Sequence, residues 1–333
     1  MTKDKLIFIK IIILLFTSSI IISCSSNKFD VKLTENLEDV KLLHYDEVLF
    51  ENNPYNIHTK LDSLAKIYPV FINGDYKNDA AVNGLIEYIQ NPLNQKLYQE
   101  CKNQESKFKN AEEEITLSFK YFQHYFSDKK LPLIYFYISG LNYEEPIIIA
   151  DSLTILVGKD LFLGAKYPIY GQYQIPLFVS QKFDTKFLAF QIMRRYLYQT
   201  FSKNLKGKNL IENIIALGKV EYILHALFPN NTTEEILNFT PEQMNWCEQK
   251  EKAFWQHLAD EQMLFNEDYH TYKKYIEDRP FISSLEKDSP GRAGIWIGYR
   301  IIEQYMDNKN ITITQLMETN DMMGIFNEAK YKP

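Results

Sequence analysis

The sequence lacks the short motifs that mark common enzymes. It contains no His-Glu-x-x-His, no Gly-x-Ser-x-Gly, no glycine-rich phosphate loop and no cysteine pair at zinc spacing. Its six histidines are scattered, and no two of them lie three or four residues apart. A metal site or a general acid–base site needs several such groups together. These absences argue against a conventional hydrolase, and we expect neither a metal nor a cofactor.

Lysine and arginine form no long basic run, and the formal net charge is -6. Nucleic-acid-binding proteins concentrate positive charge on one face, so we expect no DNA or RNA partner. The three cysteines, Cys24, Cys101 and Cys247, are too few for a disulfide framework. A bridge between Cys101 and Cys247 stays open as an alternative, although free thiols are favoured.

The N-terminus has the pattern of a lipoprotein signal peptide. Lysines at positions 3, 5 and 10 precede an apolar run that ends just before Cys24. We expect residues 1–23 to be removed and Cys24 to carry acyl chains such as palmitate, which attach a protein durably when several are present. The alternative is an uncleaved membrane anchor, although the run is shorter than the about 20 apolar residues that a span prefers. Either segment tethers the rest to a membrane from outside the cytoplasm.

The mature chain is predicted to be a polar tether, residues 24–39, followed by a single globular domain, residues 40–333. Helical spacing of apolar residues predicts a helical part over residues 40–130. Short β-branched and aromatic runs at 133–138, 147–150 and 153–157 predict strands of a small mixed sheet within residues 131–333. The fold class is therefore α+β and mostly helical.

Long helices are predicted over residues 185–201 and 210–228. Thr240 with Gln243, and Thr312 with Gln315, have the spacing of N-terminal capping boxes, the second for the final helix. A further helix should follow Ser289-Pro290-Gly291 and carry Gly294, Trp296, Gly298 and Tyr299. Gly294 and Gly298 share one face of it, which indicates close packing or, alternatively, a binding surface that includes Arg292.

Two weaker patterns have both a functional and a structural interpretation. Glu221 and His225 lie four residues apart on one helix face, as two metal ligands would, but a site needs a third ligand and a helix-surface pair is the alternative. Tyr167, Tyr170 and Tyr173 lie in one loop, where aromatic rings bind sugars or cover the core.

Several segments resemble the gliding-motility lipoproteins of the GldB type. They are Leu163-Gly164, Lys166-Tyr167-Pro168, Gly218-Lys219, Phe239-Thr240-Pro241-Glu242-Gln243, Trp246-Cys247-Glu248 with Glu251, Ser289-Pro290-Gly291-Arg292 and Trp296-Ile297-Gly298-Tyr299. The similarity spans nearly the whole mature chain. It implies a Bacteroidetes cell-envelope lipoprotein needed for gliding, with other gliding-machinery proteins as partners and a link to type IX secretion.

A more distant likeness is to zincin-type metallopeptidases, in which a helix with His-Glu-x-x-His follows a sheet. On that pattern Arg194 and Tyr198 take the places of the two histidines, Arg195 that of the general base, and Leu217 that of the third ligand. Arginine only donates hydrogen bonds, so it neither binds zinc nor accepts a proton from water. The likeness implies a degenerate core and an inactive enzyme.

In such a core we expect Arg194 or Arg195 to lie within hydrogen-bond reach of Glu221, in a cleft to which Arg292, Trp296 and Tyr299 are candidate contributors. The alternative is that both arginines lie on the polar side of an amphipathic helix. The function we favour is a non-catalytic scaffold or assembly factor of the gliding machinery. A divergent envelope peptidase and a surface glycan-binding lipoprotein are the alternatives. The sequence leaves open the direct partner and the choice between inner and outer membrane.

Overall fold

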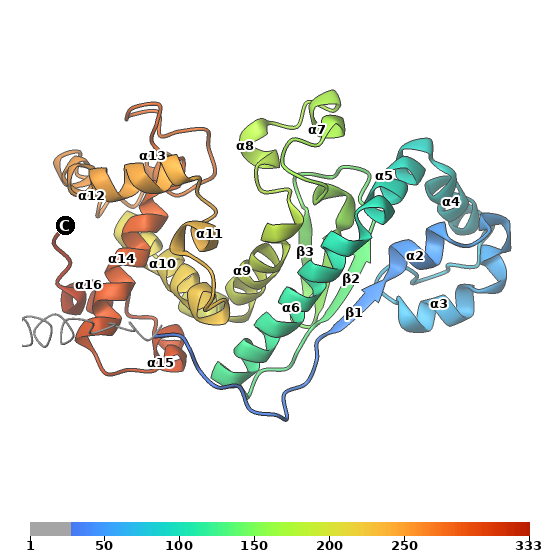
Figure 1. Ribbon diagram of the computed structural model, residues 1–333, viewed down its shortest axis with the longest axis horizontal. Helices are drawn as coiled ribbons and strands as arrows, with labels where there is room; N and C mark the ends of the chain where they lie inside the picture. The colour runs from blue at the N-terminus through green and yellow to red at the C-terminus, as the bar shows by residue number, and fades with distance from the viewer. Residues whose placement is uncertain (1–27) are drawn as a thin grey trace, which may run out of the picture. The chain divides into compact units, whose positions relative to one another are not determined.

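A four-stranded mixed sheet organises the computed structural model, which describes residues 28–333 (Figure 1). The predicted cleavage after residue 23 and the lipid on Cys24 lie outside the described residues. The strand order is β1-β2-β4-β3. Strands β1 (Lys41–His44), β2 (Leu133–Tyr137) and β4 (Thr154–Gly158) are parallel, whereas β3 (Ile147–Asp151) runs antiparallel to β4 at one edge. The three predicted strands are confirmed.

The first strand corrects the predicted boundary between a helical part and a sheet part. Strand β1 lies at residues 41–44, inside the range that we expected to be helical, and it pairs with β2 in parallel. Four residues are too few to show strand alternation in the sequence. A parallel pair needs a long crossover connection, and the N-terminal helices supply it. Residues 33–333 accordingly form one unit and not two successive parts.

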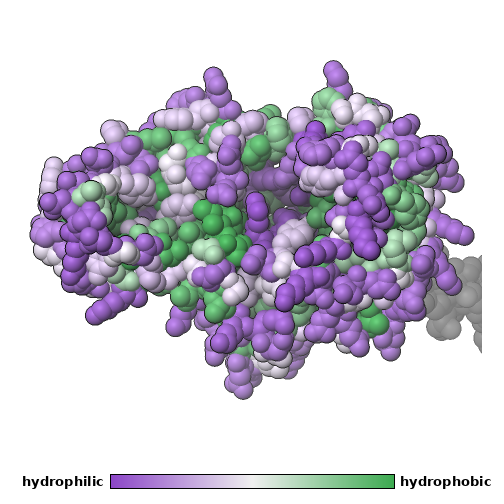
Figure 2. All heavy atoms as spheres, turned by 180° about the vertical axis from the view of Figure 1, so that it is seen from behind, coloured by the Kyte–Doolittle hydropathy of each residue, from purple (hydrophilic) through white to green (hydrophobic). Residues whose placement is uncertain are grey.

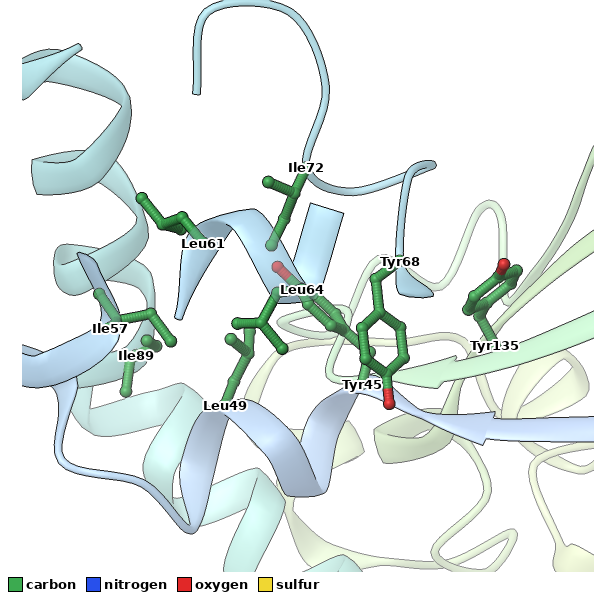
Figure 3. Packing of buried hydrophobic residues seen from close by; sticks show 9 residues of the cluster. All are labelled: Tyr45, Leu49, Ile57, Leu61, Leu64, Tyr68, Ile72, Ile89 and Tyr135. Carbon is green, nitrogen blue, oxygen red and sulfur yellow. The ribbon is translucent and has the colours of Figure 1, made fainter. Parts of the chain in front are cut away.

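The crossover between β1 and β2 is entirely helical. Its elements are α2 (Tyr45–Phe50), the 3-10 helix η1 (Pro54–Thr59), α3 (Leu61–Ile67), α4 (Asp79–Gln90), α5 (Pro92–Asn103) and α6 (Glu105–Tyr125). The apolar faces of α2, η1, α3 and α4, with the segment that follows α3, meet in a cluster that reaches the sheet at Tyr135 of β2 (Figure 3). The Tyr45 and Phe71 rings stack at 4.2 Å between centroids within it. Each large apolar side chain buried there contributes about 1.5–3 kcal/mol.

The chain after β4 is a second helical region. Its elements are η2 (Lys159–Leu161), α7 (Pro168–Gln172), α8 (Leu177–Ser180), η3 (Thr185–Phe187), α9 (Leu188–Thr200), η4 (Ser202–Asn204), α10 (Leu210–Leu227), α11 (Thr233–Leu237), α12 (Pro241–Asp260), α13 (Tyr269–Tyr272), η5 (Lys273–Tyr275), α14 (Ala293–Asn308), α15 (Ile313–Glu318) and α16 (Met322–Ala329). Both predicted capping boxes are present, at Thr240 and Thr312. The helix that Thr312 begins is not the last, because α16 follows it.

Helix α10 is buried on almost every side, as expected of a helix that is apolar all round. It crosses α14 where Gly218 faces Gly298: a Cβ on Gly218 would overlap the backbone of Gly298, and one on Gly298 would overlap the carbonyl oxygen of Ile214. Gly294 lies similarly close to the carbonyl oxygen of Tyr275. The predicted close packing of Gly294 and Gly298 is confirmed. None of the helices within residues 28–333 has the length and apolar character needed to cross a bilayer.

Candidate functional site

A cleft with a volume of about 570 Å³ lies between the β3 edge of the sheet and the second helical region. Its walls come from β3, α8, α9, α10, the residues after η5 and the start of α14. We call this cavity of about 570 Å³ the central cleft. Figure 2, which views the molecule from behind, shows a hollow near the middle, with apolar residues grouped beside it. It is large enough for several amino-acid side chains, and it lies within the range of ligand pockets.

The central cleft contains a buried ion pair between α9 and α10. Arg194 donates through Nε to Oε1 and through Nη2 to Oε2 of Glu221, each at 2.8 Å, and Nη2 also reaches the carbonyl oxygen of Ile236 at 2.6 Å. Glu221 is completely buried and the Arg194 side chain is 12 % exposed. Burial alone would lower the pKa of Arg194. The facing carboxylate of Glu221 outweighs this effect, so the pKa lies above its ordinary value. The expected contact of Arg194 with Glu221 is present, in the bidentate geometry of the strongest such pairs.

A second cluster of charged side chains also lines the central cleft. Lys182 forms an ion pair with Asp278, and Arg292 places Nε 3.3 Å from the same carboxylate. Burial, helped by the charge of Arg292, lowers the pKa of Lys182 to about 8. Burial opposes ionisation of Asp278, but the two cations hold its pKa below the ordinary value. Arg292 also donates to the carbonyl oxygen of Leu237, so its position is fixed by two partners.

All four positions that the zincin likeness singled out line the central cleft: Arg194, Arg195, Tyr198 and Leu217. Glu221 and Arg292 line it too. Arg195 differs from the other cations because it is exposed and its side chain makes no hydrogen bond or ion pair with the described residues. Burial raises the pKa of the Tyr198 phenol, which therefore stays neutral at physiological pH.

Trp296 and Tyr299 do not belong to the central cleft, and their assignment to a binding surface is wrong. Both are at least 95 % buried. The Trp296 indole donates to Glu251 at 3.0 Å, and the Tyr299 hydroxyl lies 2.7 Å from Nδ1 of His225. They lie in the first two turns of α14 and pack against other parts of the protein. Helical spacing identifies the face that they share but not what covers it.

The proposed metal pair of Glu221 and His225 is likewise separated. Glu221 faces Arg194, whereas His225 faces Tyr299. Among residues 28–333, no group of three or more His, Cys, Asp or Glu side chains is arranged to hold a metal ion. Cys101 and Cys247 are both free and buried, which excludes the bridge between them.

The three loop tyrosines do not form one surface. Tyr170 is 2 % exposed, and its hydroxyl donates to the carbonyl oxygen of Asp160 and accepts from the amide of Leu163. Tyr173 is 51 % exposed, whereas Tyr167 is half-buried. A sugar platform needs rings side by side on the surface, so packing explains Tyr170 better.

Sequence reasoning missed Lys182, Asp278 and the edge of β3. Lys182 and Asp278 lie in irregular segments, where no periodicity marks them, and they meet only because the fold brings residues nearly a hundred positions apart together. An edge strand is equally invisible, since the sequence gives no strand order. Of the two residues, only Asp278 lies near a motif that the sequence singled out, fourteen residues before Arg292.

Comparison with known proteins gives one match. The family described as "Gliding motility protein GldB" matches residues 26–333, which is almost the whole of the predicted mature chain. No curated protein and no solved structure matches, so the zincin likeness remains a prediction. The chain therefore belongs to the GldB family of gliding-motility proteins, lipoproteins by the name of the family.

Proposed function

We propose that this protein is a non-catalytic scaffold or assembly factor of the gliding machinery, tethered to the envelope through a lipid on Cys24 and facing away from the cytoplasm. Family membership supports the involvement in gliding motility. The scaffold role, the link to type IX secretion and the lipid anchor are parts of the proposal. Other envelope proteins of the machinery are its partners.

The observation that carries the proposal is the Arg194–Glu221 pair. Each carboxylate oxygen of Glu221 accepts a hydrogen bond from one guanidinium, and the side chain is completely buried. A carboxylate committed in this way is a poor base for water, and arginine cannot act as one. The pair is therefore a structural element at the place where a hydrolase would need a reactive group. The scaffold thus presents its central cleft as a binding surface.

A charge-pair replacement in cells separates the scaffold from a peptidase. In a gliding strain that lacks its own copy, we expect Arg194→Met/Glu221→Leu to restore gliding, because an apolar pair of similar volume replaces a buried ion pair with little loss of stability. Each single variant should fall in abundance, because it leaves one charge buried without its partner. The measurements are the speed of single cells and the protein level by immunoblot.

The contradictory result is equally clear. A double variant present at wild-type level that restores no gliding would assign a reactive role to the pair and support a divergent hydrolase. Glu303→Gln, in α14 and outside the central cleft, is a control for the loss of one carboxylate.

The anchor is tested separately. We expect Cys24→Ala to move the protein from the membrane fraction to the soluble fraction of the envelope, because the thiol is the attachment point for the acyl chains. Cell fractionation and mass spectrometry of the mature N-terminus measure this. A Cys24→Ala protein that stays with the membrane would favour an uncleaved anchor.

A further inference from the structure

The outer edge of β3 carries unpaired backbone groups. In the antiparallel pair with β4, Ile147 lies opposite Val157 and Ile149 opposite Ile155. The Gly158 amide donates to the carbonyl oxygen of Pro146 at 3.0 Å, which makes residues 146 and 158 a hydrogen-bonded pair. Because hydrogen-bonded and non-hydrogen-bonded pairs alternate, Ile148 pairs with Leu156, and the N–H and C=O groups of Ile147 and Ile149 point to the free edge.

This edge runs along a continuous groove. The central cleft adjoins a second cavity of about 490 Å³ that Ile148 and Ile149 help to line. The two cavities share Glu144, Ile147, Arg195 and Tyr198. Ile148 and Ile149 are half-buried and, as successive strand residues, lie on opposite faces of the sheet, so an apolar side chain flanks the unpaired backbone on each face. An exposed strand edge of this kind is a ready template for another strand.

The charges around the groove favour a particular occupant. Arg195 is the exposed cation that lines both cavities, and its side chain makes no hydrogen bond or ion pair with the described residues. Arg194, Lys182 and Arg292 already face carboxylates. Glu144 lines both cavities and Glu145 the second, and both are exposed at the end of the groove where β3 begins. An incoming carboxylate therefore meets one guanidinium that has no ion-pair partner.

A second copy of this chain is a poor occupant. Antiparallel pairing of two β3 edges about Ile148 would bring Glu145 of one copy toward Asp151 of the other, twice, although the irregularity between Ile149 and Asp151 shifts the register at that end. Like charges brought together across a strand pair destabilise it. The acidic ends of β3 instead suit a strand with basic ends.

We propose that the free edge of β3 binds an extended segment of a partner protein as a fifth strand, with an acidic side chain of that segment against Arg195. Backbone hydrogen bonds to Ile147 and Ile149 provide affinity, and the groove provides specificity for the side chains of the bound segment. This inference rests on the proposed scaffold function, because it names the chemistry by which the scaffold holds a partner.

Fluorescent peptides test the charge. The probes are nine-residue peptides of alternating Thr and Val with a Lys at each end and Glu, Gln or Lys at one central position, titrated against the whole mature protein by fluorescence anisotropy. We expect the Glu peptide to bind at least about tenfold more tightly than the Lys peptide. Arg195→Glu should reverse that order, whereas Lys96→Glu, an exposed change on α5, should leave it intact.

A proline substitution tests the backbone. Ile149→Pro removes an N–H that faces the free edge and no ladder bond, a position where an edge strand tolerates proline. Ile149→Ala removes the same side chain but keeps the N–H. We expect at least about tenfold weaker binding by Ile149→Pro than by Ile149→Ala. In hydrogen exchange, the segment 146–150 of the wild type should become protected when the Glu peptide binds.

Three results would overturn the proposal: no binding of any peptide in the panel, no reversal with Arg195→Glu, or equal binding by the two Ile149 variants. Dimerisation in analytical ultracentrifugation that Ile149→Pro abolishes would identify a second copy as the occupant instead. If the peptides fail while Arg194→Met/Glu221→Leu still restores gliding, the scaffold survives and binds its partner through another surface.

Discussion

Two neighbouring patches on the surface of helix α10 are built on opposite principles, and we call them the glycine face and the cleft face. On the glycine face Gly218 meets Gly298 of α14, with no side chain between the two backbones. On the cleft face, three residues later and therefore adjacent around the helix, Glu221 is buried against Arg194 of α9. The glycine face requires that neither residue has a side chain, whereas the cleft face requires that the carboxylate of Glu221 is paired with the guanidinium of Arg194. One helix thus couples the packing of the second helical region to the geometry of the central cleft.

The difference shows where each face can change. Any added side chain disturbs the glycine contact, because the obstacle is backbone that cannot move without separating the helices. The charged contact tolerates a change of chemistry, provided that both partners change together. The glycine face therefore constrains the fold more strictly than the cleft face does.

The largest expected effect comes from the glycine face. Gly298→Ala should lower the free energy of unfolding by about 5 kcal/mol or prevent folding, because the new Cβ overlaps the carbonyl oxygen of Ile214. Gly84→Ala is the matched control: it lies in α4 with nothing within 4 Å of the new Cβ, and should stabilise by about 0.5–1 kcal/mol. Urea unfolding followed by circular dichroism measures both. Equal stability of the two variants would refute the close-packing explanation.

On the cleft face, single substitutions should lower the free energy of unfolding, and the double substitution should restore most of it. We expect Glu221→Leu to cost about 4 kcal/mol, since Arg194 is left buried without a carboxylate. In Arg194→Met/Glu221→Leu most of that loss should disappear, which gives a favourable coupling in a double-mutant cycle. Losses that simply add would mean that the two side chains act independently, against the geometry of the pair.

A smaller effect concerns Lys219, the residue that follows Gly218 in α10. Its ammonium group donates to the carbonyl oxygens of Asn204, Met317 and Thr319, and burial lowers its pKa from 10.5 to about 7. Above pH 7 the folded chain therefore holds fewer protons than the unfolded chain. The free energy of unfolding should rise with pH between 7 and 9, by at most about 1.4 kcal/mol per pH unit from this group.

Substitution isolates that contribution. Lys219→Met should flatten the rise between pH 7 and 9, whatever its effect on stability at one pH, while Lys96→Met on the surface of α5 should preserve it. Denaturant midpoints at five pH values give the slope. An unchanged slope in Lys219→Met would assign the pH dependence to other groups, with Lys182 the next to examine.

The α14 side of the glycine contact was predictable from the sequence because its signal is local, whereas Gly218, its partner on α10, was not singled out for packing. Gly294 and Gly298 lie one helical turn apart, and helix propensity, capping boxes and Pro241 at a first helical position place the elements around them. Periodicity also places α10 within one residue at its C-terminal end. Local signals of this kind need no knowledge of what packs against the helix.

The cleft was predictable only in part. The zincin alignment brought Arg194, Arg195, Tyr198 and Leu217 together because they lie on two consecutive helices at fixed spacing. It gave no sign of Lys182 and Asp278, which depend on the path of irregular segments, nor of β1, whose partner lies about ninety residues later. Trp296 and Tyr299 failed for a related reason: a helix face is visible in the sequence, but its neighbour is not.

Zinc binding tests the central claim most directly. The whole mature protein, incubated with excess zinc and then freed of unbound metal, should retain far less than one ion per chain by elemental analysis, because Arg194 supplies the positive charge beside Glu221. The zinc content of the Arg194→Met variant, in which that positive charge is missing, should be measured in the same way for comparison. One tightly held zinc ion per wild-type chain would contradict the scaffold account and return the protein to the metallopeptidases.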